Sequence, residues 1–429
     1  MPAKAPLFAV FRFVVEQIGA DSKRVGANAD DVLFGALVGR IRHPSIHRAV
    51  RRNAVSSVLE EHLGYVGDSV RLEQFKSAVA QVVKHGDYIT DLGCGTGILG
   101  LLCLQAGASR VYAIDATDMI EVARESFVRA GWGGQAIFMG DYSTRANLPE
   151  RVDVVICDQV GYFGFDAGII EYLADARRRF LKPGGALIPA RLRLQLAAVE
   201  SETSYGLADG WRREGVHSEF HWLGQYAVNT KYAVNLQREE LLGAPAELGS
   251  IDFREDNPDF FSWDAELRIE RDGVVHGLGG WFDCELAEGV WLTNSPLADR
   301  PIKRPQAFLP IGEAVEVKSG DVVRARVMAR PTDSVIAWEI EIPSGGRKFS
   351  HSTWQGELRT PAEIMKRNPA HVPRPNCRGQ ARMIVLGLCD GQRTVRQVEE
   401  AVLREHPGLF PSVEETARFV AQVLGKDTE

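Results

Sequence analysis

Three features are missing from this 429-residue chain, and each absence excludes a class of protein. The six cysteines form no Cys-x-x-Cys pair, which argues against a zinc site or a disulfide framework and favours a reducing, cytoplasmic setting. Positive charge is not in excess, because the formal net charge is −7, so nucleic acid is not the expected partner. A long uncharged apolar run is also absent. Residues 8–18 carry Arg12 and Glu16, which predicts a helix packed on the protein and no membrane span.

The hydrophobic pattern divides the chain into four regions. Residues 1–63 have helical spacing and predict an N-terminal helical segment. Residues 64–190 alternate short apolar runs with helical patterns, which is typical of a doubly wound α/β domain with a parallel sheet. Residues 191–358 change to alternating, β-branched runs separated by turns and predict an antiparallel β-barrel domain. Residues 359–429 return to a helical pattern.

A glycine-rich turn, Asp91-Leu-Gly-Cys-Gly-Thr-Gly97, lies between a predicted strand and a predicted helix. Three glycines let its backbone bend sharply and approach a ligand closely: Gly93, Gly95 and Gly97. Asp91 in front of the turn would repel phosphate but suits the ammonium of an amino acid, which S-adenosylmethionine (SAM) offers. Asp115 ends the next strand, where a carboxylate can accept from ribose hydroxyls, and Asp141 after the third strand could face the adenine edge. The pattern predicts SAM as cofactor and S-adenosylhomocysteine as its product.

Two segments carry a family resemblance. Tyr88–Gly100 is similar to the first motif of the protein arginine methyltransferases, and Asp68–Phe75 is similar to their Asp-x-x-Arg-x-x-x-Tyr helix, with Phe75 in place of Tyr. From about residue 65 to 358 the chain resembles that family. The resemblance implies a seven-stranded Rossmann-like domain followed by a β-barrel, a homodimer, and a role for Arg71 in binding the SAM carboxylate. The alternative for Arg71 is an ordinary surface position on a helix.

The segment Cys157-Asp-Gln-Val-Gly-Tyr162 resembles the start of the family's double-glutamate loop, with departures. Asp158 takes the first glutamate position, but the second falls on Ala167. Its neighbour Asp166 could substitute only if the loop shifts. Asp158 is expected to orient the acceptor or accept its proton, because open α/β sheets bind ligands at the carboxyl ends of their strands. The alternative for Asp158 is a helix cap.

Three aromatic residues and two cations are further candidates on the acceptor side. A dry pocket around the sulfonium could be lined by Tyr162, Phe163 and Phe165, or these aromatic residues could pack in the core. Tyr162 is also a catalytic candidate, and Phe165 a substrate-binding one. Lys303 and Arg304 stand where the resembling family has His and Trp. As a substrate-binding pair they would repel a guanidinium and attract an anion, unless they belong to a solvated loop.

These departures favour a substrate other than an ordinary protein arginine. The sequence therefore predicts methylation of a peptide or peptide-derived natural product. Arginine methylation of a protein or peptide is one alternative, and a SAM-binding regulatory partner without catalysis is another.

Residues 359–429 lie outside that resemblance. Leu386–Val395, followed by helices with capping boxes at Thr394 and Ser412, is similar to PqqD-like domains, which are small winged-helix modules that often bind leader peptides. The resemblance implies that this module delivers a peptide substrate. A packing or dimerisation appendage is the alternative.

Overall fold

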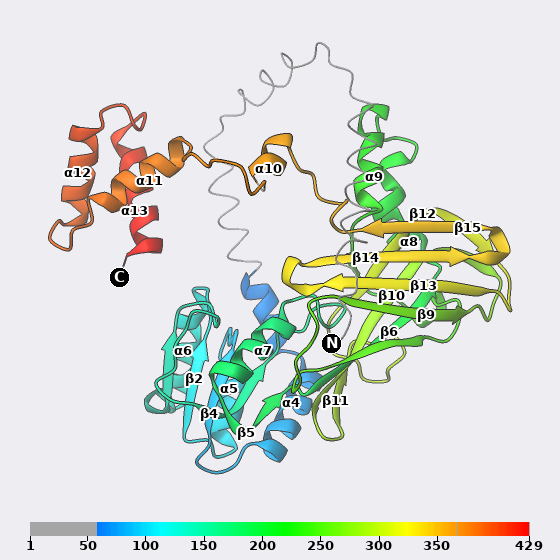
Figure 1. Cartoon of the computed structure of the whole chain (residues 1–429). Helices are drawn as coiled ribbons and strands as arrows, with labels where there is room; N and C mark the ends of the chain where they lie inside the picture. Colours follow the sequence, from blue (N-terminus) through cyan, green and yellow to red (C-terminus); the bar gives the residue numbers. More distant parts are fainter. Residues whose placement is uncertain (1–57, 367, 429) are drawn as a thin grey trace, which may run out of the picture. The chain divides into compact units, whose positions relative to one another are not determined.

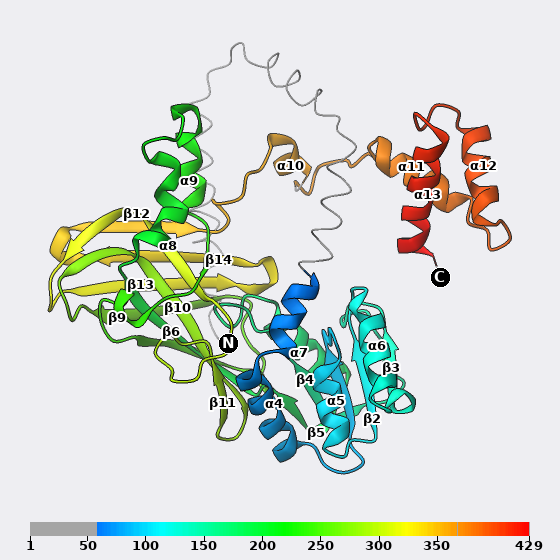
Figure 2. The same ribbon diagram turned by 180° about the vertical axis from the view of Figure 1, so that it is seen from behind.

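The computed structural model describes residues 58–366 and 368–428 (Figures 1 and 2). The chain divides into two compact units, one ending at Trp354 and the other formed by Gln355–Glu429. The helix expected at residues 8–18 lies outside the described residues, and so does most of the expected N-terminal segment, of which 58–63 are part of a described helical stretch at 58–66. Among the helices that the structure describes, none combines the length and apolar character needed to cross a membrane.

The first unit begins with a parallel sheet whose strands have the order β3-β2-β1-β4-β5. The strands are β1 Tyr88–Leu92, β2 Arg110–Ile114, β3 Ala136–Met139, β4 Val152–Cys157 and β5 Leu181–Ile188. The three central strands are almost entirely buried, as their uninterrupted apolar character predicts. The sequence predicts seven strands, but the sheet has five within the described residues, so that expectation was wrong there. The next strand, β6, pairs instead with β8 and β10 of the antiparallel domain, so it extends a different sheet.

Four helices accompany this sheet: α4 Ser69–Val82, α5 Ile98–Gln105, α6 Met119–Arg129 and α7 Ile169–Arg179. Contacts join α5 to β1 and β2, α6 to β2 and β3, and α7 to β4 and β5. The strand order reverses between β1 and β4, because β2 and β3 follow on one side and β5 on the other. Such a reversal opens a crevice at the carboxyl ends of the two strands, where doubly wound sheets bind their ligands.

Two antiparallel sheets follow in the first unit. The larger has the order β7-β12-β10-β6-β8, with β11 paired to β10, and the smaller has the order β15-β14-β13-β9. The two sheets lie beside each other at both sides: edge strand β8 contacts β9, and β12, next to the short edge strand β7, contacts β15, as expected of a barrel-like domain. The larger sheet comprises β6 Arg191–Val199, β7 Tyr232–Val234, β8 Ala246–Asp252, β10 Gly273–Ala287, β11 Val290–Thr293 and β12 Gln306–Val317. The smaller comprises β9 Phe261–Arg268, β13 Val322–Arg330, β14 Val335–Ile342 and β15 Arg347–Ser352.

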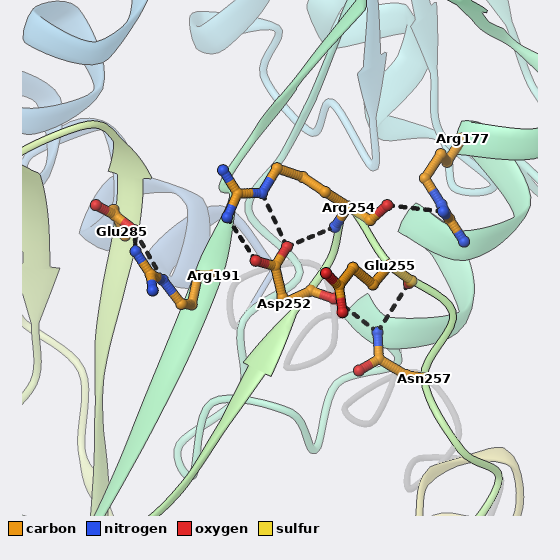
Figure 3. A network of polar contacts seen from close by, with 7 residues as sticks. All are labelled: Arg177, Arg191, Asp252, Arg254, Glu255, Asn257 and Glu285. Atoms are coloured by element: carbon orange, nitrogen blue, oxygen red, sulfur yellow. Dashed lines mark hydrogen bonds and ion pairs between the residues drawn. The ribbon is translucent and has the colours of Figure 1, made fainter. Parts of the chain in front are cut away.

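A polar network ties α7 to the antiparallel domain (Figure 3). The Arg177 guanidinium donates to the carbonyl oxygen of Arg254 at 2.7 Å, and the Arg254 side chain in turn pairs with Asp252 at the end of β8. Nearby, Arg191 of β6 pairs with Glu285 of β10 at 2.6 Å. These contacts fix the junction of the two sheets, and hence the relation between the crevice and the antiparallel domain.

The second unit is helical in its described residues, with α10 Pro361–Lys366, α11 Cys377–Gly387, α12 Val395–Glu405 and α13 Val413–Asp427. Its own small core includes Val385, Val402 and Val420. The capping box at Thr394 is present, and the Ser412 hydroxyl caps the next helix. The wing strands of a winged-helix module are absent from the described part of this unit, and its resemblance to PqqD-like domains stays a prediction.

Candidate active site

The glycine-rich turn follows β1 and leads into α5. Gly93, Gly95 and Gly97 all have positive φ values, of 63°, 53° and 81°, which side chains other than glycine rarely adopt. A methyl group at Gly93 would collide with the side chain of Gln159, and one at Gly95 would lie 2.7 Å from the ring of His62. The turn is therefore fixed by conformation and by close packing.

Asp91, at the carboxyl end of β1, is buried and only half satisfied. Its Oδ2 accepts a hydrogen bond from the Gly100 backbone N–H at 2.9 Å, whereas Oδ1 has no partner among the described residues. Burial raises the pKa of Asp91 to about 7, although the Gly100 N–H and the charge of Arg71 act in the opposite direction. A buried carboxylate with one unused oxygen fits a cationic donor such as the ammonium of SAM.

Asp115 ends the neighbouring strand β2 and holds the turn in place. One carboxylate oxygen accepts from the Gly95 N–H at 2.9 Å, and the other accepts from the backbone and hydroxyl of Thr117. A carboxylate offers about four acceptor positions, so one remains for a ribose hydroxyl. Asp141 lies after β3 at the same edge of the sheet, but its half-exposed carboxylate pairs with Arg145 at 2.5 Å. The adenine contact expected of Asp141 stays a prediction.

Arg71 is buried, so the alternative of an ordinary surface position does not hold. Arg71 lies in the first turn of α4. Asp68, which precedes the helix, caps it by accepting a hydrogen bond from the Arg71 N–H. The Arg71 Nε donates to Asp158 Oδ2 at 2.6 Å, and Nη1 donates to the carbonyl oxygen of Tyr65 at 3.2 Å. Arg71 thus connects the cofactor side of the crevice to the expected acceptor side.

Asp158 follows β4 and receives a second cation from the antiparallel domain. Arg304, between β11 and β12, lies 3.4 Å from Asp158 Oδ2 and donates to the carbonyl oxygen of Val160 at 2.8 Å. Burial alone would raise the pKa of Asp158, but Arg71 and Arg304 outweigh it and lower the pKa from its usual value. Asp158 Oδ1 is buried and has no partner in the described part of the chain. Asp158 therefore serves as an ion-paired carboxylate in the crevice, and the alternative of a helix cap is not what the structure has.

Lys303 and Arg304, which were expected to bind substrate together, differ in their surroundings. Arg304 is buried beside Asp158, whereas the side chain of Lys303 is exposed. Only the Lys303 backbone contributes, by donating to Asp68 at 2.7 Å. A substrate-binding role for the Lys303 side chain is therefore not supported, since it points into solvent at a loop, as the alternative reading held.

Asp166 does not join Asp158 as a free carboxylate. Its Oδ1 accepts from the Phe163 N–H at 2.9 Å, and its Oδ2 forms an ion pair with Lys231. Burial lowers the pKa of Lys231 to about 8. The pair holds the loop after β4 against the segment that leads into β7, which gives Asp166 a positioning role.

The aromatic residues of this loop also divide. Phe163 and Phe165 are buried, with ring centroids 5.5 Å apart, and Phe165 packs on Trp263 of β9. Phe165 is therefore a core residue, because no face of its ring is open to a substrate. Tyr162 is 40% exposed and remains the aromatic candidate at the acceptor side. The backbone carbonyl of Tyr162 accepts from Asn294 at 2.9 Å.

Sequence reasoning missed three residues of the site. Gln159 packs on the glycine turn, Lys231 pairs with Asp166, and Asn294 ties the loop to β11. Asn294 directly follows β11, which ends at Thr293. Lys231 carries no local signal, because only the fold brings it to Asp166. No group of three or more metal-ligating side chains was found among the described residues.

Known proteins resemble large parts of this chain. Residues 89–185 match the family model of the methyltransferase domain. Histone-arginine methyltransferase CARMER from Drosophila sechellia is 27% identical over 334 residues, covering 71% of this chain, and the Drosophila melanogaster protein, a probable histone-arginine methyltransferase CARMER, gives the same figures. This chain spans only 62% of the length of those relatives.

Two solved structures share the fold. The Trypanosoma brucei PRMT1 enzyme–prozyme heterotetrameric complex with AdoHcy aligns with a TM-score of 0.60 at 19% identity, over 68% of this chain and 96% of that one. Arabidopsis thaliana protein arginine methyltransferase 10 aligns with a TM-score of 0.59 at 23% identity, over 69% and 98%.

Fold, glycine turn and comparisons together define the class: the chain is a SAM-dependent methyltransferase. Its fold is that of the protein arginine methyltransferases, with SAM as cofactor. The expectation of a peptide-derived natural product as substrate is not supported, because the similar proteins are named for arginine methylation.

Proposed function

We propose that this chain transfers a methyl group from SAM to a guanidinium nitrogen of arginine in a protein or peptide. The observation that carries the proposal is the carboxylate of Asp158. It is buried and ionised, it has an oxygen without a partner among the described residues, and it follows β4, the strand that pairs with β1 and its Asp91. A guanidinium N–H is a suitable donor to such an oxygen, since charge-assisted hydrogen bonds of this kind are both strong and directional. The arginine methyltransferases that share the fold support the same acceptor.

The residues divide the work between cofactor and acceptor. When bound, SAM supplies an electrophilic methyl group on its sulfonium. Asp91 would hold its ammonium, Asp115 its ribose, and Arg71 its carboxylate. Asp158 orients the acceptor so that one nitrogen lone pair faces the methyl carbon, and transfer then leaves S-adenosylhomocysteine and a methylated guanidinium. The lowered pKa of Asp158 makes it a poor proton acceptor, so the released proton passes to solvent and Asp158 acts as an orienting group.

Oligomerisation is a further part of the proposal. Between β6 and β7 the chain forms α8 Glu202–Asp209 and α9 Gly224–Ala227, drawn in green in Figures 1 and 2. Three large apolar side chains in this region are half exposed: Trp211, Phe220 and Trp222. Apolar patches of this kind are typical of protein interfaces, and the resembling family dimerises through an arm on its barrel. Light scattering on a Trp222→Glu variant tests whether a dimer depends on them.

The acceptor is tested with isotope-labelled SAM and two matched peptides. One peptide is rich in arginine, and the other has every arginine replaced by lysine. We expect label in the arginine peptide alone, and mass spectrometry should place the added methyl group on the guanidinium. Tight SAM binding without transfer to any arginine peptide would contradict the proposal and leave a cofactor-binding partner without turnover.

A further inference from the structure

Two arginines converge on a single oxygen of Asp158. Arg71 Nε lies 2.6 Å and Arg304 Nη2 lies 3.4 Å from Oδ2, and all three side chains are at most 10% exposed. The other oxygen, Oδ1, is buried and has no partner among residues 58–366 and 368–428. One negative charge is thus shared by two positive charges, and half of the carboxylate is unused.

The two arginines come from different parts of the chain. Arg71 belongs to α4 and also acts on Asp91, whose pKa its charge lowers against the effect of burial, so it faces the cofactor side. Arg304 comes from the antiparallel domain and bonds to Val160, within the loop that follows Asp158. The Tyr65 ring lies 5.7 Å from both guanidinium carbons, and this cation–π contact helps to hold two like charges close together. Arg304 is therefore the cation tied to the loop after β4, which is the expected acceptor side.

A guanidinium paired with a carboxylate is the same chemical contact that an acceptor arginine must make with Asp158. We propose that Arg304 is a specificity-determining residue that competes with the acceptor arginine for Asp158, leaving only Oδ1 to receive it. This inference rests on the proposed function. Arg304 fills the place of one donor on the carboxylate and repels a second cation in a buried setting, where charges interact more strongly than in water.

The competition has a consequence for substrate choice. Because Asp166 is already paired with Lys231, the described loop offers no second free carboxylate to offset the charge of Arg304. An arginine peptide then binds weakly, and a peptide whose neighbouring acidic groups offset that charge is preferred. Removing the charge of Arg304 should therefore improve the binding of arginine peptides.

The test measures the affinity of an arginine peptide for protein loaded with S-adenosylhomocysteine, using calorimetry. We expect Arg304→Gln to bind the peptide about tenfold more tightly than the natural chain, as loss of a close like-charge contact predicts, with unchanged affinity for S-adenosylhomocysteine. Arg304→Lys keeps the charge and should stay close to the natural chain. Arg300→Gln is the matched control, since Arg300 is an exposed cation of the same loop that pairs with Glu73.

Thermal melts accompany each variant, and Arg304→Met, which keeps the length of the side chain, serves if the glutamine variant unfolds early. A well-folded charge-free variant that binds the arginine peptide no more tightly than the natural chain overturns the competition. The readout is binding, so it is separate from turnover. Absence of methyl transfer in every variant would refute the proposed function while the affinities still decide the role of Arg304.

Discussion

The cofactor edge and the acceptor edge of the crevice are built in opposite ways. At the cofactor edge, Asp91 keeps a buried oxygen without a partner among the described residues, and burial raises its pKa to about 7. At the acceptor edge, Asp158 and Asp166 are each neutralised by cations from the chain itself. The carboxylate of Asp91 thus has no ion pair within the described residues, whereas the carboxylates of the acceptor edge are paired with cations of the chain.

This difference explains why the two edges tolerate change differently. A carboxylate whose ionic partner is the ammonium of the cofactor contributes to cofactor binding, so its replacement lowers the affinity for SAM. A carboxylate already paired within the protein contributes to folding as well, because a buried ion left alone is costly. The predictions below separate these two contributions, from the largest effect to the smallest.

The largest effect is expected at Asp91. We expect Asp91→Asn to weaken SAM binding at least about 100-fold, because a buried charge pair loses one partner. Thermal stability of the cofactor-free protein should not fall, since a carboxyl whose pKa is raised by burial favours the neutral form. Calorimetry with SAM and a melt without it measure both. Asp87→Asn, at the opposite end of β1, is the control. Unchanged affinity in Asp91→Asn would mean that the ammonium is held elsewhere.

Asp158→Asn should instead separate turnover from cofactor binding. We expect a loss of about 100-fold in kcat for an arginine peptide, because the neutral amide no longer orients a guanidinium through a charge-assisted bond. SAM affinity should fall much less than kcat, since Asp91 and Asp115 are untouched and Arg71 loses only its contact with Asp158. Single-turnover kinetics and calorimetry on the same preparation give the two values. A parallel loss of SAM affinity would place Asp158 on the cofactor side and contradict the division of the crevice.

Asp166 offers the contrasting case on the same loop. Asp166→Asn leaves Lys231 buried without its partner and should lower the free energy of unfolding by about 3 kcal/mol. The double variant with Lys231→Met should recover most of that loss, because an apolar side chain replaces the orphaned cation. Urea unfolding of the natural chain, of each single variant and of the double variant gives the four free energies of this double-mutant cycle. Equal loss in single and double variants would show that the ion pair contributes nothing beyond its two side chains.

The sequence predicted the strand, turn and helix of the cofactor edge because these elements are contiguous. The strand, the glycine turn and the helix Ile98–Gln105 follow one another, so local pattern specifies their geometry. The acceptor edge is specified by pairs that are 65 to 146 residues apart, such as Asp166 with Lys231 and Asp158 with Arg304. No local pattern encodes such a pair. The number of strands in the parallel sheet was predicted wrongly for a similar reason, since β6 pairs with β8 and β10, which lie far along the chain.

The pH dependence of SAM binding gives a smaller and graded test of the cofactor edge. Asp91 has a pKa of about 7 without cofactor, so it becomes protonated as the pH falls through that value. The ammonium binds the ionised form, and affinity should therefore fall by about tenfold for each pH unit below 7. Asp91→Asn should lack this slope. A natural chain that binds SAM equally at pH 6 and pH 7.5 would show that Asp91 is not the ammonium partner.

The smallest effect is expected at Asp141, which belongs to the cofactor edge by position but resembles the acceptor edge in being paired. Its carboxylate lies at the surface beside Arg145, and exposed ion pairs contribute little because water and salt screen them. Asp141→Asn should therefore alter SAM affinity by no more than about twofold if the pair persists in the complex, since surface pairs have small energies. A loss of tenfold or more, matched by an equal loss in binding of S-adenosylhomocysteine, would mean that Asp141 leaves Arg145 to face the adenine. The rule that the cofactor edge holds its acids unpaired would then extend to all three strand ends.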